Sequence, residues 1–282
     1  MPELPEVETV RRGLERVLVG RRITAVEVGR ERTVRRTSRE ALVAGLTATT
    51  VTAARRRGKY LLCPLDSGDE LMIHLRMSGR LLAAAAGAPR PAHTHVVLHL
   101  DPATDSSGEL WFVDPRTFGE MVVFDPDRRD VEVPELGRLG VDPVVDGLDR
   151  DTLASLLAAR RGRLKAVLLD QHVVAGIGNI YADETLHRAR LRPDRRADTL
   201  SSREVGRLHG SLLEVLEEAI EAGGSTLDDT QYVDPEGRHG WFQVHHLVYG
   251  RAGQRCLSCG RADIVRSVEA GRTTSWCPRC QR

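Results

Sequence analysis

Short apolar runs separated by turn-forming residues fill the first half of the chain. The runs are five or six residues long: ITAVEV (23–28), YLLCPL (60–65), ELMIHL (70–75), HVVLHL (95–100), ELWFV (109–113) and EMVVF (120–124). Short strands at this spacing favour a β-sandwich or a barrel. A helix is expected before them, over residues 3–19, because acidic residues occupy its first turn and arginines its later turns.

The hydrophobic period changes in the second half. Residues 125–148 are rich in Asp, Pro and Gly and are interpreted as a linker. Helical patterns follow at TLASLLAAR (152–160), RLKAVLLDQ (163–171), NIYADETLHRA (179–189) and a longer stretch over 202–221. Ser201 and Glu204 form an S-x-x-E capping box at the start of the last helix.

A glycine-rich turn joins two of these helices. Gly176 and Gly178 allow a tight joint, and Asn179 is placed to cap the helix that follows. Such a turn can offer free N–H groups to a phosphate. Glycine turns between helices are also ordinary connections, so the pattern alone is a weak signal.

Length and composition describe a globular protein of one large or two smaller domains. The 282 residues are 41% hydrophobic and 29% charged, which is enough to bury a core. No run of 18 apolar residues occurs, so we expect no membrane span. The opening PELPEVE lacks the basic and apolar parts of a signal peptide, which predicts a cytoplasmic protein.

The net charge of +1 hides an uneven distribution. Residues 1–60 hold 14 basic and 7 acidic side chains, and residues 251–282 hold 7 and 2, while the middle of the chain is acidic. A polyanion could therefore bind one basic face. The basic residues are almost all Arg; the two exceptions are Lys59 and Lys165. A lysine pKa can be tuned and an arginine pKa cannot, although chance could also leave two lysines.

Four cysteines occur as two CxxC pairs with 17 residues between them: Cys256, Cys259, Cys277 and Cys280. This spacing predicts one structural Zn²⁺ held by four thiolates, with disulfides as the weaker alternative. Arg261, Arg266, Arg272 and Arg279 lie within this region. A basic hairpin of this kind contacts DNA or is simply solvated. Cys63 lies in an apolar run and is expected in the core.

The first residues could support covalent chemistry. Removal of Met1 would leave Pro2 as a free secondary amine, whose pKa near ~8 gives a neutral fraction at pH 7. Such an amine can attack an electrophilic carbon, and Glu3 could serve as the acid or base beside it. The alternative is that Pro2 and Glu3 only begin a helix.

Long motifs along the chain give a more specific indication. They are PELPEVETVRRGL (2–14), RRGKYLL (56–62), HLRMSGRL (74–81), DPRTFG (114–119), DQHVVAGIGNIYADE (170–184), GWFQVHHLVYGRAGQRC (240–256) and GRTTSWCPRCQ (271–281). In these motifs and their order the chain resembles the bacterial formamidopyrimidine-DNA glycosylases (8-oxoguanine DNA glycosylases). The related endonuclease VIII branch typically opens PEGPE, whereas this chain opens PELPE.

The resemblance implies an α+β multidomain fold. Its parts would be a catalytic helix with a β-sandwich (1–124), the linker (125–148), a helix–two-turn–helix domain (149–224), and a lesion-loop region with a zinc-finger β-hairpin (225–282). It implies a base-excision-repair enzyme, acting as a monomer on damaged double-stranded DNA. The enzyme would excise oxidised purines through an N-terminal proline Schiff base and then cut the strand by β,δ-elimination.

The resemblance also implies roles for single residues. Pro2 would be the nucleophile, Glu3 the acid, Lys59 the group that transfers protons in β-elimination, and Arg272 the group that assists δ-elimination. The residues expected to contact DNA are His93, Arg116, Arg160 and Asn179. Met77, Arg116 and Phe118 would fill the gap left by an extruded base, with Arg116 facing the orphaned cytosine.

Two departures from the family pattern stand out. Thr117 replaces the second Arg of the common DPRRFG, which puts one phosphate contact in doubt. The acidic stretch 225–237 lies where the family carries its lesion-recognition loop. Two alternatives stay open: an enzyme that prefers oxidised pyrimidines, and a catalytically silent zinc protein that binds DNA.

Overall fold

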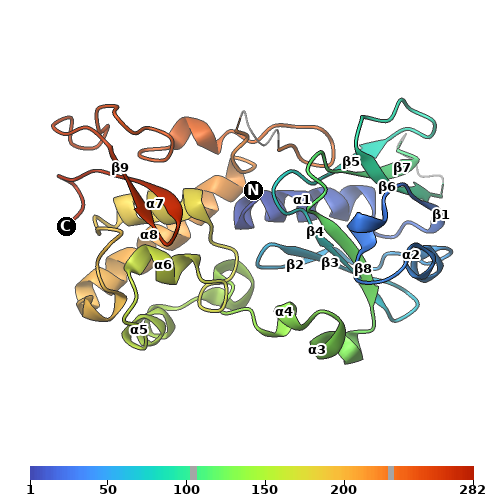
Figure 1. Cartoon of the computed structure of the whole chain (residues 1–282), viewed down its shortest axis with the longest axis horizontal. Coiled ribbons are helices and arrows are strands. Elements are labelled where there is room, and N and C mark those ends of the chain that lie inside the picture. The colour runs from blue at the N-terminus through green and yellow to red at the C-terminus, as the bar shows by residue number, and fades with distance from the viewer. Residues whose placement is uncertain (102–106, 228–231) are drawn as a thin grey trace. The chain divides into compact units, whose positions relative to one another are not determined.

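The computed structural model describes residues 1–101, 107–227 and 232–282. The chain divides into two compact units (Figure 1). Unit 1 comprises Met1–Arg138 and Ala222–Trp241, and unit 2 comprises Leu139–Glu221 and Phe242–Arg282. Both units are therefore built from two separate stretches of chain. Among the residues described, none of the helices has the length and apolar character needed to cross a bilayer.

Unit 1 is built on two four-stranded antiparallel sheets. The first has the order β1 (Ile23–Val28), β6 (Thr94–Leu100), β7 (Glu109–Val113), β5 (Arg80–Ala84). The second has the order β2 (Arg55–Arg57), β3 (Tyr60–Pro64), β4 (Glu70–His74), β8 (Glu120–Phe124). Both sheets contribute to one apolar core, with Leu98 and Phe112 from the first and Leu61 and Ile73 from the second. The expected β-sandwich is confirmed.

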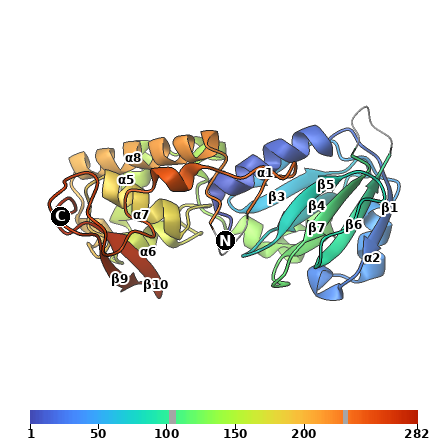
Figure 2. The same ribbon diagram turned by 90° about the horizontal axis from the view of Figure 1, so that it is seen from above.

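Helix α1 (Leu4–Val17) packs against this sandwich (Figure 2). Val7, Val10 and Leu14 are fully buried, and their spacing places them on one face of the helix. The other helices of unit 1 are shorter: α2 (Arg39–Leu46), α3 (Arg129–Glu132) and α4 (Pro134–Gly137). The free energy gained by burying these apolar side chains fixes α1, and with it the N-terminus of the chain.

Unit 2 combines helices with a hairpin. The helices are α5 (Arg150–Ala158), α6 (Leu164–Leu169), α7 (Asn179–Arg188) and α8 (Ser202–Glu221), and the hairpin strands are β9 (Val265–Glu269) and β10 (Arg272–Trp276). The capping box before α8 is confirmed: Glu204 Oε2 accepts the Ser201 N–H at 2.9 Å. The hydrogen bond from the Arg195 guanidinium, and to a smaller extent that from the Ser201 N–H, lowers the pKa of Glu204 to about 2.

The elements match the apolar pattern with a few differences. All six expected runs form strands, but β2, β5 and α2 carried no clear signal. The segment 125–148, expected as a linker, contains α3 and α4 and is divided between the two units. Residues 222–241 pack with unit 1, whereas the sequence placed a boundary at 224. The cap of α7 is Gly178, and Asn179 is the first helical residue.

Candidate nucleic-acid interface

The N-terminal residues are buried at the start of α1. Pro2 is buried, and Glu3, the N-cap of the helix, is 4% exposed. Glu6 Oε2 accepts the backbone N–H of Glu3 at 2.8 Å. The backbone N–H groups at a helix N-terminus have no partner within the helix, so this hydrogen bond to the Glu3 N–H holds the first turn in place. The two residues expected to do the chemistry thus lie on a fixed segment.

Glu6 also binds a segment far away in the sequence. Its Oε1 accepts the N–H of Ser225 at 2.7 Å, and the Tyr232 hydroxyl donates to the Glu6 carbonyl at 3.1 Å. Gly224 has a φ of +80°, and a Cβ there would lie 2.7 Å from Glu6 Oε1. The sequence indicated only that Glu6 favours a helix N-terminus; nothing in it pointed to a contact across 219 residues.

Lys59 lies in the tight turn between β2 and β3. The turn is Gly58–Lys59, and Lys59 is 7% exposed. Arg56 holds the turn, because its Nη1 donates to the Gly58 carbonyl at 3.0 Å and its Nε donates to Glu8 Oε2 at 3.1 Å. Since Glu8 belongs to α1, this ion pair connects the lysine turn to the helix that carries Pro2 and Glu3.

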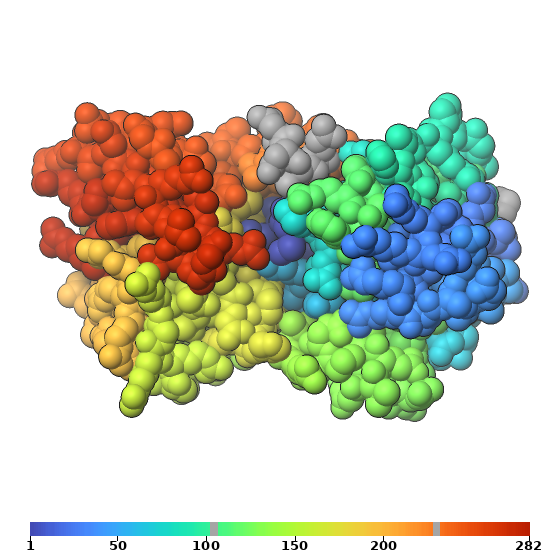
Figure 3. Space-filling view, viewed as in Figure 1, coloured from blue at the N-terminus to red at the C-terminus, as the bar shows by residue number. Residues whose placement is uncertain are grey.

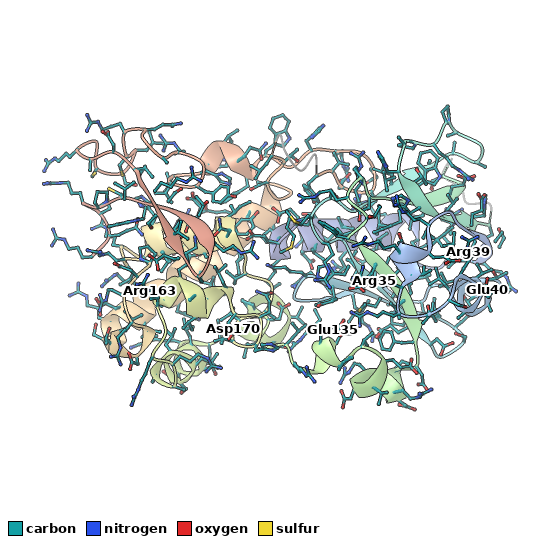
Figure 4. All side chains as sticks on the ribbon, viewed as in Figure 1. Arg35, Arg39, Glu40, Glu135, Arg163 and Asp170 are labelled. Carbon is teal, nitrogen blue, oxygen red and sulfur yellow. The ribbon has the colours of Figure 1, made fainter. Side chains whose placement is uncertain are left out.

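The exposed large apolar side chains of unit 1 include Met77 and Phe118. Met77 is 36% and Phe118 is 38% exposed. The Arg116 guanidinium lies 5.3 Å from the centre of the Phe118 ring, within cation–π range. Arg35, labelled in Figure 4, donates to the Phe118 carbonyl at 3.3 Å. Figure 3 shows the atoms of the segment before α2, in blue, beside those of the 114–119 loop, in green.

The segments around these side chains have unusual backbone conformations. Arg76, His93 and Thr117 have φ values of +52°, +67° and +56°. His93 is exposed. Thr117 is buried at 8% exposure, so the position where many family members have Arg does not offer a side chain to a phosphate here.

The glycine turn of unit 2 leads into α7. Gln171 holds this turn: its Oε1 accepts the Gly176 N–H at 2.9 Å, and its Nε2 donates to the Ile177 carbonyl at 2.8 Å. Asn179 Nδ2 donates to the Thr273 carbonyl on β10 at 2.9 Å. The helix start and the hairpin are therefore bound to each other. Gln171 was not expected from the sequence, because glutamine in a helical pattern gives no sign of a turn contact.

The two other basic residues expected to bind DNA are also in unit 2. Arg272 is exposed and begins β10, directly after the Ala270–Gly271 turn of the hairpin. Arg160 follows α5, is half-buried, and donates from Nη1 to the Leu156 carbonyl at 3.4 Å. Unit 2 thus holds Arg160, Asn179 and Arg272, while unit 1 holds Pro2, Glu3, Lys59, Met77, His93, Arg116 and Phe118.

The four cysteines meet at the base of the hairpin. Their Sγ atoms all lie within 4.8 Å of one another. The Cys256–Cys280 and Cys259–Cys277 sulfurs are 3.8 Å apart. A disulfide would place two sulfurs at about 2.05 Å. Four sulfurs around a tetrahedral zinc at ~2.3 Å are about 3.8 Å apart, so the arrangement fits a metal and not disulfides. Cys63 is buried in the core, and burial raises its pKa to about 12.

Comparison with known proteins agrees with this geometry. Residues 1–121 match the formamidopyrimidine-DNA glycosylase N-terminal domain, and residues 139–231 match the corresponding H2TH domain. The chain is 42% identical over 281 residues to the formamidopyrimidine-DNA glycosylase of Desulfitobacterium hafniense, covering all of both chains. It is 44% identical over 296 aligned residues to that of Rhodopseudomonas palustris, again over the full length of both.

Solved structures give the same result. The MutM (Fpg) protein of Thermus thermophilus superposes with a TM-score of 0.87 at 42% identity, covering 99% of this chain and 98% of that one. A Lactococcus lactis Fpg mutant in complex with DNA containing Fapy-dG has a TM-score of 0.89 at 36% identity over all of both chains. From its fold, its cysteine cluster and these matches, the chain belongs to the formamidopyrimidine-DNA glycosylase family.

Proposed function

We propose that this protein is a base-excision-repair glycosylase that removes oxidised purines such as 8-oxoguanine and formamidopyrimidines from duplex DNA and then cuts the strand. The observation that carries the proposal is the full-length match to proteins named formamidopyrimidine-DNA glycosylase. The buried N-terminal turn that presents Pro2 and Glu3 supports it. Damaged double-stranded DNA is the partner, and the enzyme acts as a monomer.

In the glycosylase step, Pro2 is the nucleophile. Once Met1 is removed, the lone pair of the Pro2 nitrogen attacks C1′ of the damaged nucleotide, and the bonding electrons of the glycosidic bond leave with the base, which takes up the proton that the Pro2 nitrogen loses. Glu3 donates a proton to the sugar oxygen as the C1′–O4′ bond breaks. The product is an iminium between Pro2 and C1′. A fixed helix start helps, because a nucleophile already in position needs less ordering during the reaction.

In the lyase steps, the iminium withdraws electrons from the sugar. Loss of a proton from C2′ releases the phosphate on C3′, and a second elimination releases the phosphate on C5′. Lys59 moves protons in the first elimination, and Arg272 binds phosphate during the second. Lys59 is almost fully buried, and a lysine can give up its proton where an arginine cannot.

The remaining residues bind and deform the DNA. A base inside a duplex must be extruded before C1′ can be attacked, which costs a few kcal/mol. Met77 and Phe118 offset this cost by filling the vacated space, and Arg116 faces the orphaned base. Asn179, His93 and Arg160 bind phosphates. Zinc, when bound by the four cysteines, would cross-link the two CxxC turns and thereby keep the hairpin that carries Arg272 folded.

Borohydride trapping tests the proposal. If the iminium forms, reduction links protein to DNA irreversibly, and the linked peptide is the N-terminal one. Duplexes should contain 8-oxoguanine opposite each base, with dihydrouracil as the pyrimidine lesion. Faster trapping on 8-oxoguanine supports the proposal, and faster trapping on dihydrouracil would indicate an oxidised-pyrimidine enzyme. A silent DNA-binding protein gives no adduct, and an adduct at Lys59 would overturn the nucleophile.

Glu3→Gln separates the two halves of the reaction. The variant should lose most base excision while it still cuts a pre-formed abasic site, because there the base has already left. An uncleaved N-terminal tag converts the amine to an amide and should abolish both activities. Pro2→Gly keeps a primary amine and should retain part of the activity.

A further inference from the structure

Asp114 lies at the end of β7, and its buried carboxylate accepts hydrogen bonds from two loops. It is 0% exposed. Its Oδ1 accepts the Ser78 hydroxyl at 2.5 Å and the Arg116 N–H at 3.2 Å, and its Oδ2 accepts the Gly119 N–H at 2.7 Å. One carboxylate therefore binds both the loop that carries Met77 and the loop that carries Phe118.

The backbone of Asp114 binds a third segment. Its N–H donates to the His93 carbonyl at 3.0 Å. Its carbonyl oxygen lies 2.8 Å from Nε2 of the buried His95, and it also accepts the Thr117 N–H at 3.2 Å. Through its side chain and main chain, Asp114 thus contacts all three segments of unit 1 that carry exposed residues expected to bind DNA.

These segments are strained and closely packed. Of the six described non-glycine residues with positive φ, three lie in them: Arg76, His93 and Thr117. Such conformations persist only where the surrounding structure holds them. A Cβ on Gly119 would lie 2.5 Å from Phe112 Cζ and 3.1 Å from Asp114 Oδ2, so the loop can approach the carboxylate this closely only with glycine at that position.

We propose that Asp114 is a positioning residue: it holds the segments 76–79, 93–95 and 116–119 in the single arrangement that inserts Met77, Arg116 and Phe118 into the gap left by the extruded base. This inference rests on the proposed function, because the insertion of these side chains belongs to it. Asp114 touches no DNA in this role. It acts through the loops, and a loop freed from it would lose part of the binding energy to ordering itself on DNA.

Asp114→Asn tests the inference. The amide has one acceptor oxygen and places an N–H₂ group where a donor now binds, so at least one of the three hydrogen bonds to the carboxylate is lost. Ser78→Ala is the milder variant, since it removes one donor and leaves the carboxylate in place. Asp142→Asn is the matched control: Asp142 is equally buried and accepts the N–H groups of Val144 and Val145 at 3.0 Å, on a turn with no residue expected to bind DNA.

The first readout is insertion, which needs no catalysis. The probe is a duplex with 2-aminopurine opposite a tetrahydrofuran abasic analogue, whose fluorescence reports the environment of the orphaned base. We expect Asp114→Asn to remove most of the fluorescence change that the parent produces at saturation, Ser78→Ala to reduce it, and Asp142→Asn to leave it unchanged. A full change with Asp114→Asn overturns the inference. A parent that binds no DNA overturns both the inference and the proposed function.

The second readout is kinetic, at a temperature where every variant is folded. Asp114→Asn should slow single-turnover excision of 8-oxoguanine by 10-fold or more, and slow trapping on a pre-formed abasic site by less than 3-fold, because no base must be extruded there. Combined with Phe118→Ala, it should add little further loss, since both act on the same insertion. Independent, additive losses would contradict the inference. A parent that inserts but does not cut would overturn the proposed function alone.

Discussion

Lys165 Nζ lies 2.6 Å from Asp183 Oδ1, and neither side chain is more than 1% exposed. The same ammonium donates to the Thr274 hydroxyl at 2.8 Å, and Asp183 Oδ2 accepts the Ser275 N–H at 2.9 Å. Burial raises the pKa of Asp183, and the neighbouring Lys165 ammonium opposes this shift. The second lysine of the chain is therefore a structural one that joins α6 and α7 to β10.

Lys165→Met should destabilise unit 2 strongly. It leaves the Asp183 carboxylate buried without its counter-ion, which typically costs about 3–5 kcal/mol. Urea unfolding measures the loss, and adding Asp183→Asn should restore a large part of it. Arg196→Ala is the control: Arg196 pairs with Asp198 at 2.6 Å, but the two side chains are 56% and 18% exposed, so its removal should cost no more than about 1 kcal/mol. Equal losses for both variants would contradict the prediction.

Metal removal should unfold the hairpin and leave unit 1 intact. We expect one zinc per chain by elemental analysis, and weaker DNA binding once it is stripped with a chelator. Cys277→Ser should have the same effect, because three thiolates and a hydroxyl bind zinc poorly. Cys63→Ser is the control thiol, since it changes no ligand. Full strand-cutting activity in a metal-free preparation would show that the zinc is dispensable.

His74 should make stability depend on pH. Burial, and to a smaller extent the positive charge of Arg76, lowers the pKa of His74 to about 3. Its Nδ1 accepts the Arg76 backbone N–H at 2.9 Å. An unfolded histidine has a pKa of about 6.5. The stabilisation by neutral His74 is thus complete above pH 6.5 and is lost toward pH 3, by up to about 1.4 kcal/mol per pH unit.

His74→Asn isolates this contribution, because the amide oxygen can accept the same N–H but does not titrate. The charged groups around His74 in the parent are Arg36, Lys59, Arg76 and Glu120, and they are unchanged in the variant. Urea unfolding at pH 7.0, 5.5 and 4.5 should show that the free energy of unfolding falls more steeply with decreasing pH in the parent than in the variant. Parallel pH profiles would mean that His74 does not resist protonation.

Two variants should distinguish the binding of the protein to the DNA backbone from the extrusion of the lesion. Asn179→Ala should weaken binding to lesion and undamaged duplexes alike, by roughly 10-fold or more, since a hydrogen bond to a charged group is worth about 1.5–3 kcal/mol and phosphates carry no sequence information. Phe118→Ala should instead reduce excision far more than binding to undamaged DNA. Fluorescence anisotropy and single-turnover cutting measure the two effects, and wild-type behaviour of both variants would place the interface elsewhere.

The sequence predicted best those features that depend on neighbouring residues. The strands could be read because each is a short apolar run, and the cysteine cluster because each CxxC supplies two ligands from one turn. Strand β2 was missed because three consecutive arginines carry no apolar signal; its pairing with β3 and the Arg56–Glu8 ion pair define it. The contacts of Glu6 with Ser225 and of Asp114 with Ser78 could not be recognised, because these partners lie 219 and 36 residues away along the chain.

The contact between Glu6 and Ser225 has a consequence for synthesis on the ribosome. The first 138 residues emerge long before residues 222–241, yet both stretches form unit 1. Until the later stretch arrives, Glu6 lacks the Ser225 N–H and the Ala83 N–H lacks the Pro235 carbonyl that it binds at 2.7 Å. Domains tend to fold as units during translation. Here the first unit to begin folding is completed only after α8 has been made, so the nascent chain does not carry a finished N-terminal turn before most of its length exists.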